Sequence, residues 1–213
     1  MYQLVEEASK VLRTPPELFD FEKDGDKAQE IADKMSEAMV KFGGIGLSAN
    51  QVGLNYRMFV MKTEDKGIVP FFNPQLTKVS QDTDLLKEGC LSFPDIYLMI
   101  KRSTAIELKY QDVKGEEHTI MLEGLAARCV QHEIDHLNGI LFLQRASRLK
   151  LERALKSRPK ERQKRIDYEK RIAIARYLKQ IEDEKANKVQ ASESSASADS
   201  DRSEQSDTLV QNT

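Results

Sequence analysis

The sequence has few of the residues that mark secreted or membrane-spanning chains. Its 213 residues include two cysteines and no tryptophan. Two cysteines are too few for a disulfide framework, so either thiol is free for metal binding or catalysis. No run approaches the ~18 apolar residues of a membrane span, and the opening MYQLVEEASK lacks the apolar core of a signal peptide. We therefore expect a cytoplasmic protein with no membrane partner.

Charge is divided unevenly along the chain. Residues 1–147 carry a net charge of −6, residues 148–188 carry +8, and residues 189–213 carry −4. The middle segment predicts a basic helical extension with one modest apolar stripe and an interruption at Pro159. The last segment is rich in Ser and acidic residues, which bury too little apolar area to offset chain entropy, so it predicts a disordered acidic tail.

The first 147 residues predict one α+β domain. Apolar residues recur at helical spacing over residues 28–42, before Gly43 and Gly44, and a second helix fits residues 125–137. Short β-type runs cover residues 57–62, 69–72, 76–80, 104–110 and 118–122, with turn signals such as Asn73-Pro74 between them. Because strands and helices do not alternate regularly, antiparallel sheets are favoured over a doubly wound sheet.

The second predicted helix contains an HExxH motif, His132-Glu133-Ile134-Asp135-His136. On a helix, residues i and i+4 lie one turn apart on the same face, so both imidazoles can bind one metal ion while Glu133 reaches a metal-bound water. Leu125 and Cys129 continue the stripe of His132 and His136, which predicts that this face points into the core. The alternative is a pair of buried histidines with ordinary hydrogen-bond partners.

Two further segments carry candidate site residues. Glu88-Gly89-Cys90-Leu91-Ser92 offers a thiol in a loop next to a glycine, and this thiol is a candidate third ligand. The small residues of Gly44–Gln51 allow a close approach of the backbone to a substrate, with a neutral amide at Gln51. Each segment alone is weak evidence, since most single cysteines are buried and inert.

Together, the three segments resemble the motifs of peptide deformylases. That family has a GxGxAAxQ-like loop, EGCLS and QHExDHLxG in this order, and the chain has GIGLSANQ (44–51), EGCLS (88–92) and QHEIDHLNG (131–139). The resemblance implies a compact α+β fold around the HExxH helix. It also implies an activity, which is removal of the N-formyl group from the initiator methionine of new polypeptides.

The resemblance assigns roles to individual residues. It implies that Cys90, His132 and His136 bind one divalent metal, usually Fe(II) in the cell, with Ni, Co or Zn as substitutes. It makes Glu133 the general base, and Gln51 and the backbone N–H of Leu91 the donors to the oxyanion. The formyl-Met peptide would be bound by residues from all three segments, namely Ile45, Gly46, Gly89, Leu125, Arg128 and Cys129.

Three positions depart from the family pattern. Ser48 replaces a frequent alanine, a change expected to be harmless, and Asn50 replaces a common proline, which is expected to loosen the loop. Arg128 stands at an often apolar position, close to the rim of the methionine pocket in the family. We expect its guanidinium to lie at this rim and to affect peptide preference.

Two other functions remain open from the sequence. A zincin-type metalloprotease shares HExxH, but it explains neither EGCLS nor Gln51, and no His follows His136 as a third ligand. A non-catalytic ribosome- or RNA-binding protein would act through residues 148–188, although charge runs are often only solvated helix faces. In the deformylase interpretation, the same basic segment is a candidate contact with the ribosome.

Overall fold

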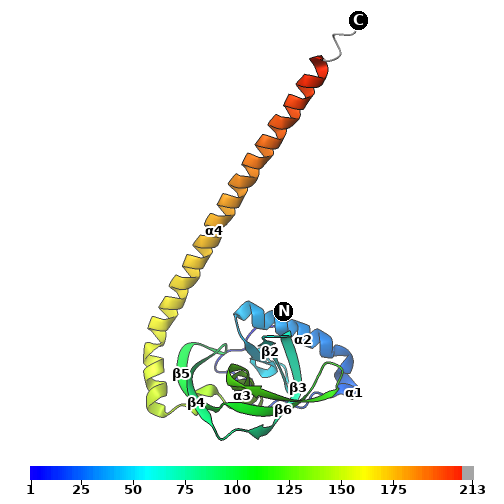
Figure 1. Ribbon diagram of the computed structural model, residues 1–213. Helices are drawn as coiled ribbons and strands as arrows, with labels where there is room; N and C mark the ends of the chain where they lie inside the picture. The colour runs from blue at the N-terminus through cyan, green and yellow to red at the C-terminus, as the bar shows by residue number, and fades with distance from the viewer. Residues whose placement is uncertain (208–213) are drawn as a thin grey trace. The chain divides into compact units, whose positions relative to one another are not determined.

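The computed structural model describes the backbone of residues 1–207 and the side chains of residues 1–180, 182 and 183. The chain divides into two compact units, Met1–Glu161 and Arg162–Thr213. The first unit contains all the strands of the described residues and the beginning of the long helix α4 (Arg148–Asp207), as Figure 1 shows. The predicted α+β class is confirmed.

The strands form two antiparallel sheets. The larger sheet has the order β1-β2-β3-β6-β7, and β4 pairs with β5 alone. The strands are β1 (Gly46–Ser48), β2 (Met58–Thr63), β3 (Gly67–Val79), β4 (Thr83–Cys90), β5 (Phe93–Ser103), β6 (Ala105–Gln111) and β7 (Glu117–Glu123).

The two predicted helices are present with nearly the predicted bounds. Helix α2 (Ala28–Phe42) ends where Gly43 adopts a φ of +71°, and the Gly43 N–H bonds to the carbonyls of Met39 and Val40. Only glycine adopts this left-handed conformation readily, which explains the helix stop. The other helices are α1 (Phe21–Asp24), α3 (Gly124–Leu137) and the 3₁₀ segments η1 (Lys10–Arg13), η2 (Gly25–Lys27), η3 (Ala49–Val52) and η4 (Phe142–Arg145).

Helix α3 is the centre of the fold. It contacts β1, β2, β6 and β7 of the larger sheet and also β5 of the smaller one. Figure 1 shows it between the β4–β5 pair and the strands β3 and β6. Apolar residues of α3, β2, β3 and β6 share one core cluster, and helix α2 packs on β1–β3 in a second. The HExxH motif is therefore held rigidly between two sheets.

Two expectations for the strands were wrong. Asn73-Pro74 does not separate two strands. It forms an irregularity inside β3, where the register with β6 shifts between Phe72 and Gln75 and Asn73 has a φ of +48°. Pro74 is tolerated because it coincides with this break in the ladder. Strands β4 and β5 were not predicted, and Glu88–Cys90 ends β4 where a loop was expected.

Helix α4 differs from the prediction at Pro159 and at the end of the first unit. Pro159 lies inside the helix and does not interrupt it. Beyond this residue the helix continues to Asp207. Residues 208–213 of the predicted disordered tail lie outside the described residues. The first unit ends at Glu161, because Leu151 and Ala154 of α4 pack against the core cluster of β5 and η4.

No helix in the described part of the chain combines the length and the apolar composition of a membrane span.

Candidate active site

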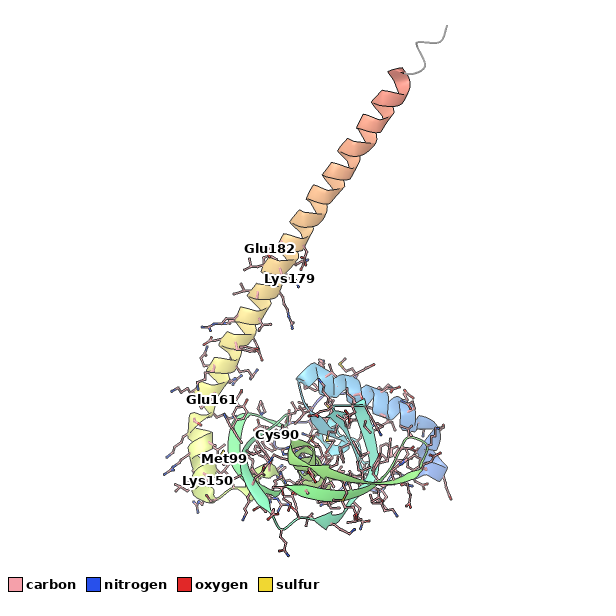
Figure 2. The ribbon with its side chains drawn as sticks, viewed as in Figure 1. Cys90, Met99, Lys150, Glu161, Lys179 and Glu182 are labelled. Carbon is pink, nitrogen blue, oxygen red and sulfur yellow. The ribbon has the colours of Figure 1, made fainter. Side chains whose placement is uncertain are left out.

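The thiol of Cys90 and the imidazoles of His132 and His136 converge at one point. One candidate ligand atom from each residue lies within 4.8 Å of the other two. The Cys90 Sγ is 3.2 Å from the His136 Nε2. The centroids of the His132 and His136 rings are 5.0 Å apart, and the ring planes form an angle of 71°. Figure 2 shows Cys90 beside the central helix. The structure thus brings together all three residues that the sequence suggested as ligands.

The end of strand β4 places the thiol at this point. The pairing of β4 with β5 shifts register between Glu88 and Cys90, so that Cys90 faces Phe93 across a tight turn. A Cβ atom on Gly89 would lie 3.0 Å from the Tyr97 ring, closer than ordinary side-chain contacts. A side chain at position 89 would press on the Tyr97 ring, so glycine fits here without displacing that ring.

The three residues fit a transition-metal ion. The His132 Nδ1 is 3.1 Å from a Glu88 oxygen, which leaves the Nε2 of this ring for a metal, as is usual for histidine ligands. The buried Nδ1 of His136 has no partner among the described residues. Burial would raise the pKa of Glu88, but hydrogen bonds from His132 and Arg102 outweigh it and lower the pKa to about 2. Thiol and imidazole donors together suit Fe(II) and Zn(II) better than Ca(II) or Mg(II).

The carboxylate of Glu133 is buried next to this cluster. The Ser48 hydroxyl donates a hydrogen bond of 2.6 Å to the Glu133 Oε2. Burial raises the pKa of Glu133, against the opposing effects of His132 and of the Ser48 hydrogen bond. The Glu133 Oε1 faces Gly46, where a Cβ atom would lie only 2.5 Å from it. Position 46 therefore leaves no room for any side chain. The carboxylate is oriented by Ser48, whose replacement of alanine we expected to be harmless.

The amide of Gln51 points at the cysteine. Its Oε1 accepts the backbone N–H of Ser48 at 2.9 Å, which fixes the orientation of the amide. Its Nε2 donates to the Ser92 hydroxyl at 3.0 Å and lies 3.6 Å from the Cys90 Sγ. An N–H donor is therefore held beside the thiol. The contribution of Ser92 was not predicted.

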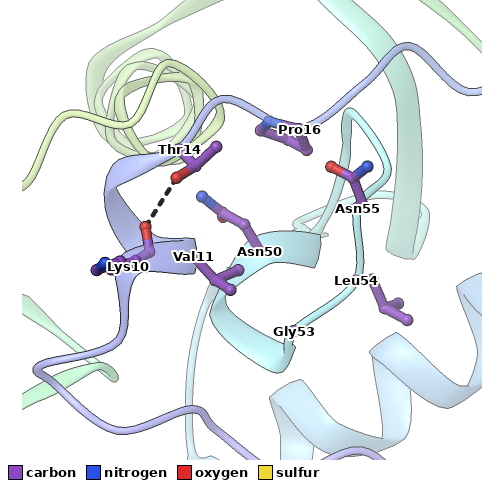
Figure 3. A pocket seen from close by; sticks show the side chains of 8 residues that line it. All are labelled: Lys10, Val11, Thr14, Pro16, Asn50, Gly53, Leu54 and Asn55. Carbon is purple, nitrogen blue, oxygen red and sulfur yellow. Dashed lines mark hydrogen bonds between the residues drawn. The ribbon is translucent and has the colours of Figure 1, made fainter.

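Asn50 fastens the loop instead of loosening it. Its Nδ2 donates to the carbonyl of His136 at 2.6 Å. Asn50 also lines a separate cavity of about 200 Å³ beyond η3, which Figure 3 shows between η1 and residues 53–55. The expectation of a looser loop was wrong, because the amide bonds to the helix that carries the histidines.

The remaining predicted peptide-binding residues divide into exposed and buried groups. Ile45 and Leu125 are exposed, at 63% and 70% of their surface, so the expected inward stripe fails at Leu125. Leu125 lies in the first turn of α3, before the helix enters the core. Cys129 is buried, which raises the pKa of its thiol well above the usual value. Leu91, which was predicted as an oxyanion donor and not as a peptide-binding residue, is partly buried and packs on the cluster around α2.

The expectation for Arg128 was wrong. Its side chain is only 7% exposed, and its guanidinium does not lie at an open rim. It donates to a Glu88 oxygen at 2.6 Å and to the carbonyl of Ile100 at 2.9 Å, and it pairs with the carboxylate of Asp84. The long side chain turns toward the β4–β5 pair because acceptors are available there.

A thiol facing an HExxH helix, with a buried carboxylate beside it, is the arrangement of a metal-dependent hydrolase. The comparison with known proteins narrows this class. The family model described as polypeptide deformylase matches residues 1–152, and the chain belongs to this family. The peptide deformylase of Zymomonas mobilis is 41% identical over 162 residues, which are 72% of this chain and 89% of the relative.

Solved structures agree with this assignment. The peptide deformylase of Thermotoga maritima has a TM-score of 0.65 at 40% identity and is matched over 69% of this chain and 98% of its own. The enzyme from Synechococcus elongatus, solved in complex with actinonin, has a TM-score of 0.69 at 35% identity, over 74% and 86% of the two chains. The protein is a metal-dependent hydrolase that removes the N-formyl group from nascent polypeptides. This result leaves the metalloprotease alternative without support.

Proposed function

We propose that Cys90, His132 and His136 hold one divalent metal ion, that Glu133 is the general base, and that Gln51 and the Leu91 N–H stabilise the oxyanion. The observation that carries this proposal is the meeting of the three ligand atoms within 4.8 Å of one another. The second thiol, of Cys129, lies outside this three-residue cluster.

The reaction follows from the positions of these groups. A bound divalent metal supplies Lewis acidity for the formyl carbonyl and for water. Glu133 accepts the proton of the water that attacks the formyl carbon, and it can then pass this proton to the leaving amine nitrogen. The C–N bond breaks, and the products are formate and a free N-terminus. The raised pKa of Glu133 suits the first of these steps, because a carboxylate with a higher pKa is the better proton acceptor.

The oxyanion donors come from two segments. The Gln51 Nε2 is held beside Cys90 by its bond to Ser92, and the Leu91 N–H follows directly after the ligand Cys90 in the chain. Loss of one such donor typically costs about 3 kcal/mol of transition-state stabilisation.

Peptide binding is assigned to the residues around this centre. Ile45 and Leu125 offer exposed apolar side chains. Gly46 and Gly89 are assigned to contact the backbone of the substrate, and Cys129 lies near Gly46. Arg128 is left out of this group, because its guanidinium is bonded elsewhere. A formyl-Met peptide would place its methionine side chain against the apolar members.

Fe(II) is the proposed metal in the cell. One thiolate and two neutral imidazoles form a donor set that accepts Fe(II), Co(II), Ni(II) and Zn(II). Anaerobically purified protein should contain about one metal ion per chain, with Fe the main element in the metal analysis. The His136→Ala variant, purified in the same way, should contain much less. A full metal content in this variant would contradict the ligand assignment.

The proposed location is the cytoplasm, because a free thiol ligand requires reducing conditions.

The basic extension is proposed to contact the ribosome through RNA phosphates. Residues 148–188 hold 15 basic and 7 acidic side chains, and Tyr168, Tyr177 and Leu178 of this segment are exposed. Phosphate contacts would be independent of RNA sequence and would weaken steeply with salt, because counterions are released on binding.

A chain that ends at Glu161 should keep its activity on short formyl peptides and lose co-sedimentation with ribosomes at low salt. This end point is preferred to Ser147, because Leu151, Ala154 and the ion pair of Arg158 with Glu7 belong to the first unit. A full-length chain with Arg171, Arg176 and Lys179 changed to Gln is the control for helix length. Undiminished sedimentation of the shortened chain would show that another surface binds the ribosome.

A further inference from the structure

Arg128 lies one helical turn before His132 and reaches three points of the β4–β5 pair. Its Nη1 donates to the Glu88 Oε1 at 2.6 Å and to the Ile100 carbonyl at 2.9 Å. Its Nη2 donates to the Asp84 carbonyl at 3.1 Å and pairs with the Asp84 carboxylate. A single guanidinium therefore ties helix α3 to both strands of the smaller sheet.

The Glu88 carboxylate is the link from Arg128 to the proposed metal ligands. Its Oε1 accepts from Arg128 and from the Arg102 Nε at 2.8 Å, and its Oε2 accepts from the Arg102 Nη2 at 2.9 Å. The same Oε2 is the atom that lies 3.1 Å from the His132 Nδ1. Because two guanidinium groups hold Oε1, the carboxylate is fixed in orientation. Its Oε2 is therefore held in place beside the His132 Nδ1.

Burial of the Arg128 guanidinium carries a desolvation cost. The residue is 6% exposed, and its buried Nε has no hydrogen-bond partner among the described residues. Well-packed apolar residues often replace buried ion pairs without loss of stability, and Glu88 would keep its two bonds to Arg102 in such a replacement. The contacts made by Arg128 therefore need an explanation beyond the stability of the fold.

We propose that Arg128 is a positioning residue, which acts through Glu88 to fix the His132 ring for metal binding. The inference rests on the ligand roles proposed above. Partners of metal-ligating histidines orient the ring, and their loss typically lowers metal affinity or activity by about 10- to 100-fold. Arg128 acts one contact further from the metal site, because it orients Glu88, which in turn orients the His132 ring.

The test uses full-length protein loaded with Co(II), which reports the geometry of its ligands in the visible spectrum. Arg128→Met keeps the bulk of the stem and removes the guanidinium. We expect the Co(II) bands to change and Co(II) to be lost to a chelator about 10-fold faster or more. We also expect kcat on formyl-Met-Ala to fall while KM stays the same, because Arg128 does not touch the peptide.

Two further variants make the result specific. Arg145→Met removes a guanidinium that pairs with Asp135 and, in the described part of the chain, forms neither a hydrogen bond nor an ion pair with Glu88, so its Co(II) spectrum and dissociation rate should match those of the parent. Arg128→Lys keeps one positive charge that can reach Glu88, so it should restore part of the parent spectrum; it also serves if the Met variant fails to fold. These expected results would support the positioning role.

Parent-like Co(II) spectra and dissociation rates in both Arg128 variants would overturn the proposal, even if the variants melt at lower temperature. A change in KM for charged peptides with unchanged metal binding would also overturn it and restore the pocket-rim interpretation. Failure of the ligand assignment is recognised separately, because Cys90→Ser would then hold Co(II) as tightly as the parent.

Discussion

Replacing Glu133 with Gln should nearly abolish turnover and leave the metal content at the parent level. The amide has almost the same shape as the carboxylate, and the Ser48 hydroxyl that now donates to Oε2 at 2.6 Å can still donate to the amide oxygen. An amide cannot accept the proton of water, so kcat on a formyl-Met peptide should fall by about 10²- to 10⁴-fold.

The control for this change is an exposed glutamate of the same domain. Glu117 lies at the start of β7 with its side chain 62% exposed, and Glu117→Gln should keep the parent rate. Both proteins should contain the same amount of metal. If Glu133→Gln keeps a rate within about twofold of the parent, Glu133 is not the base, because general-base catalysis is typically worth at least about 100-fold.

Replacing Cys90 with Ser should remove most of the bound metal. A serine hydroxyl is seldom ionised where a cysteine thiol would be, so two imidazoles would remain to hold the ion. We expect the affinity for the metal to fall by more than about 100-fold, which exceeds the typical loss of an outer-shell partner.

The second cysteine provides a matched control for this variant. Cys129 is also a free thiol close to Glu133, but it lies outside the three-residue cluster. Cys129→Ser should keep the metal, as measured by metal analysis after dialysis against a chelator. Equal retention of metal in the two serine variants would show that Cys90 is not the third ligand.

Local sequence patterns predicted the helices well, because each has a clear physical signal. Helix α2 carries an apolar face with a period of 3.6 residues and ends at a glycine that can adopt a positive φ. Helix α3 carries the HExxH motif. The sequence also predicted the convergence of Cys90 with the two histidines, through a resemblance that depends on three short motifs.

The β4–β5 pair could not be predicted from periodicity. Strand β4 has polar and charged residues on both faces, including Glu88, which is buried because it meets Arg102 and Arg128. Its partner Arg102 lies 14 residues away on β5, and its partner Arg128 lies 40 residues away on α3. Nothing in the local composition indicates that such a segment is a strand beside a core.

The same limitation explains what was missed in the site. Ser48 and Asn50 look like minor departures from a family motif, but each bonds to a residue more than 80 positions away. Arg128 looked like a rim residue, because the acceptors that hold it at β4 and β5 are visible only in three dimensions. The motifs in the sequence suggested the reacting groups, such as Glu133. The residues that orient these groups, such as Ser48, were identified only from the structure.

Helix α4 was predicted from its composition, but its contacts with the first unit were not. Its composition offers too few apolar residues for a core of its own, and in the structure its first turns pack on the catalytic unit through Leu151 and Ala154. The Arg158 guanidinium also donates to the Pro94 carbonyl at 3.1 Å, close to the turn that follows Cys90. A boundary drawn from charge alone at residue 147 therefore divides a packed segment of the domain.

Hydrolysis of the formyl group is proposed to depend on the metal cluster of Cys90, His132 and His136 and on Glu133. The most direct measurement is formate release from formyl-Met-Ala by the full chain, first stripped of metal and then supplied with one equivalent of Fe(II) under anaerobic conditions. We expect almost no formate from the stripped protein, recovery with Fe(II), and no recovery in the Cys90→Ser variant. Equal formate release by the stripped parent, or full recovery in Cys90→Ser, would contradict this proposal.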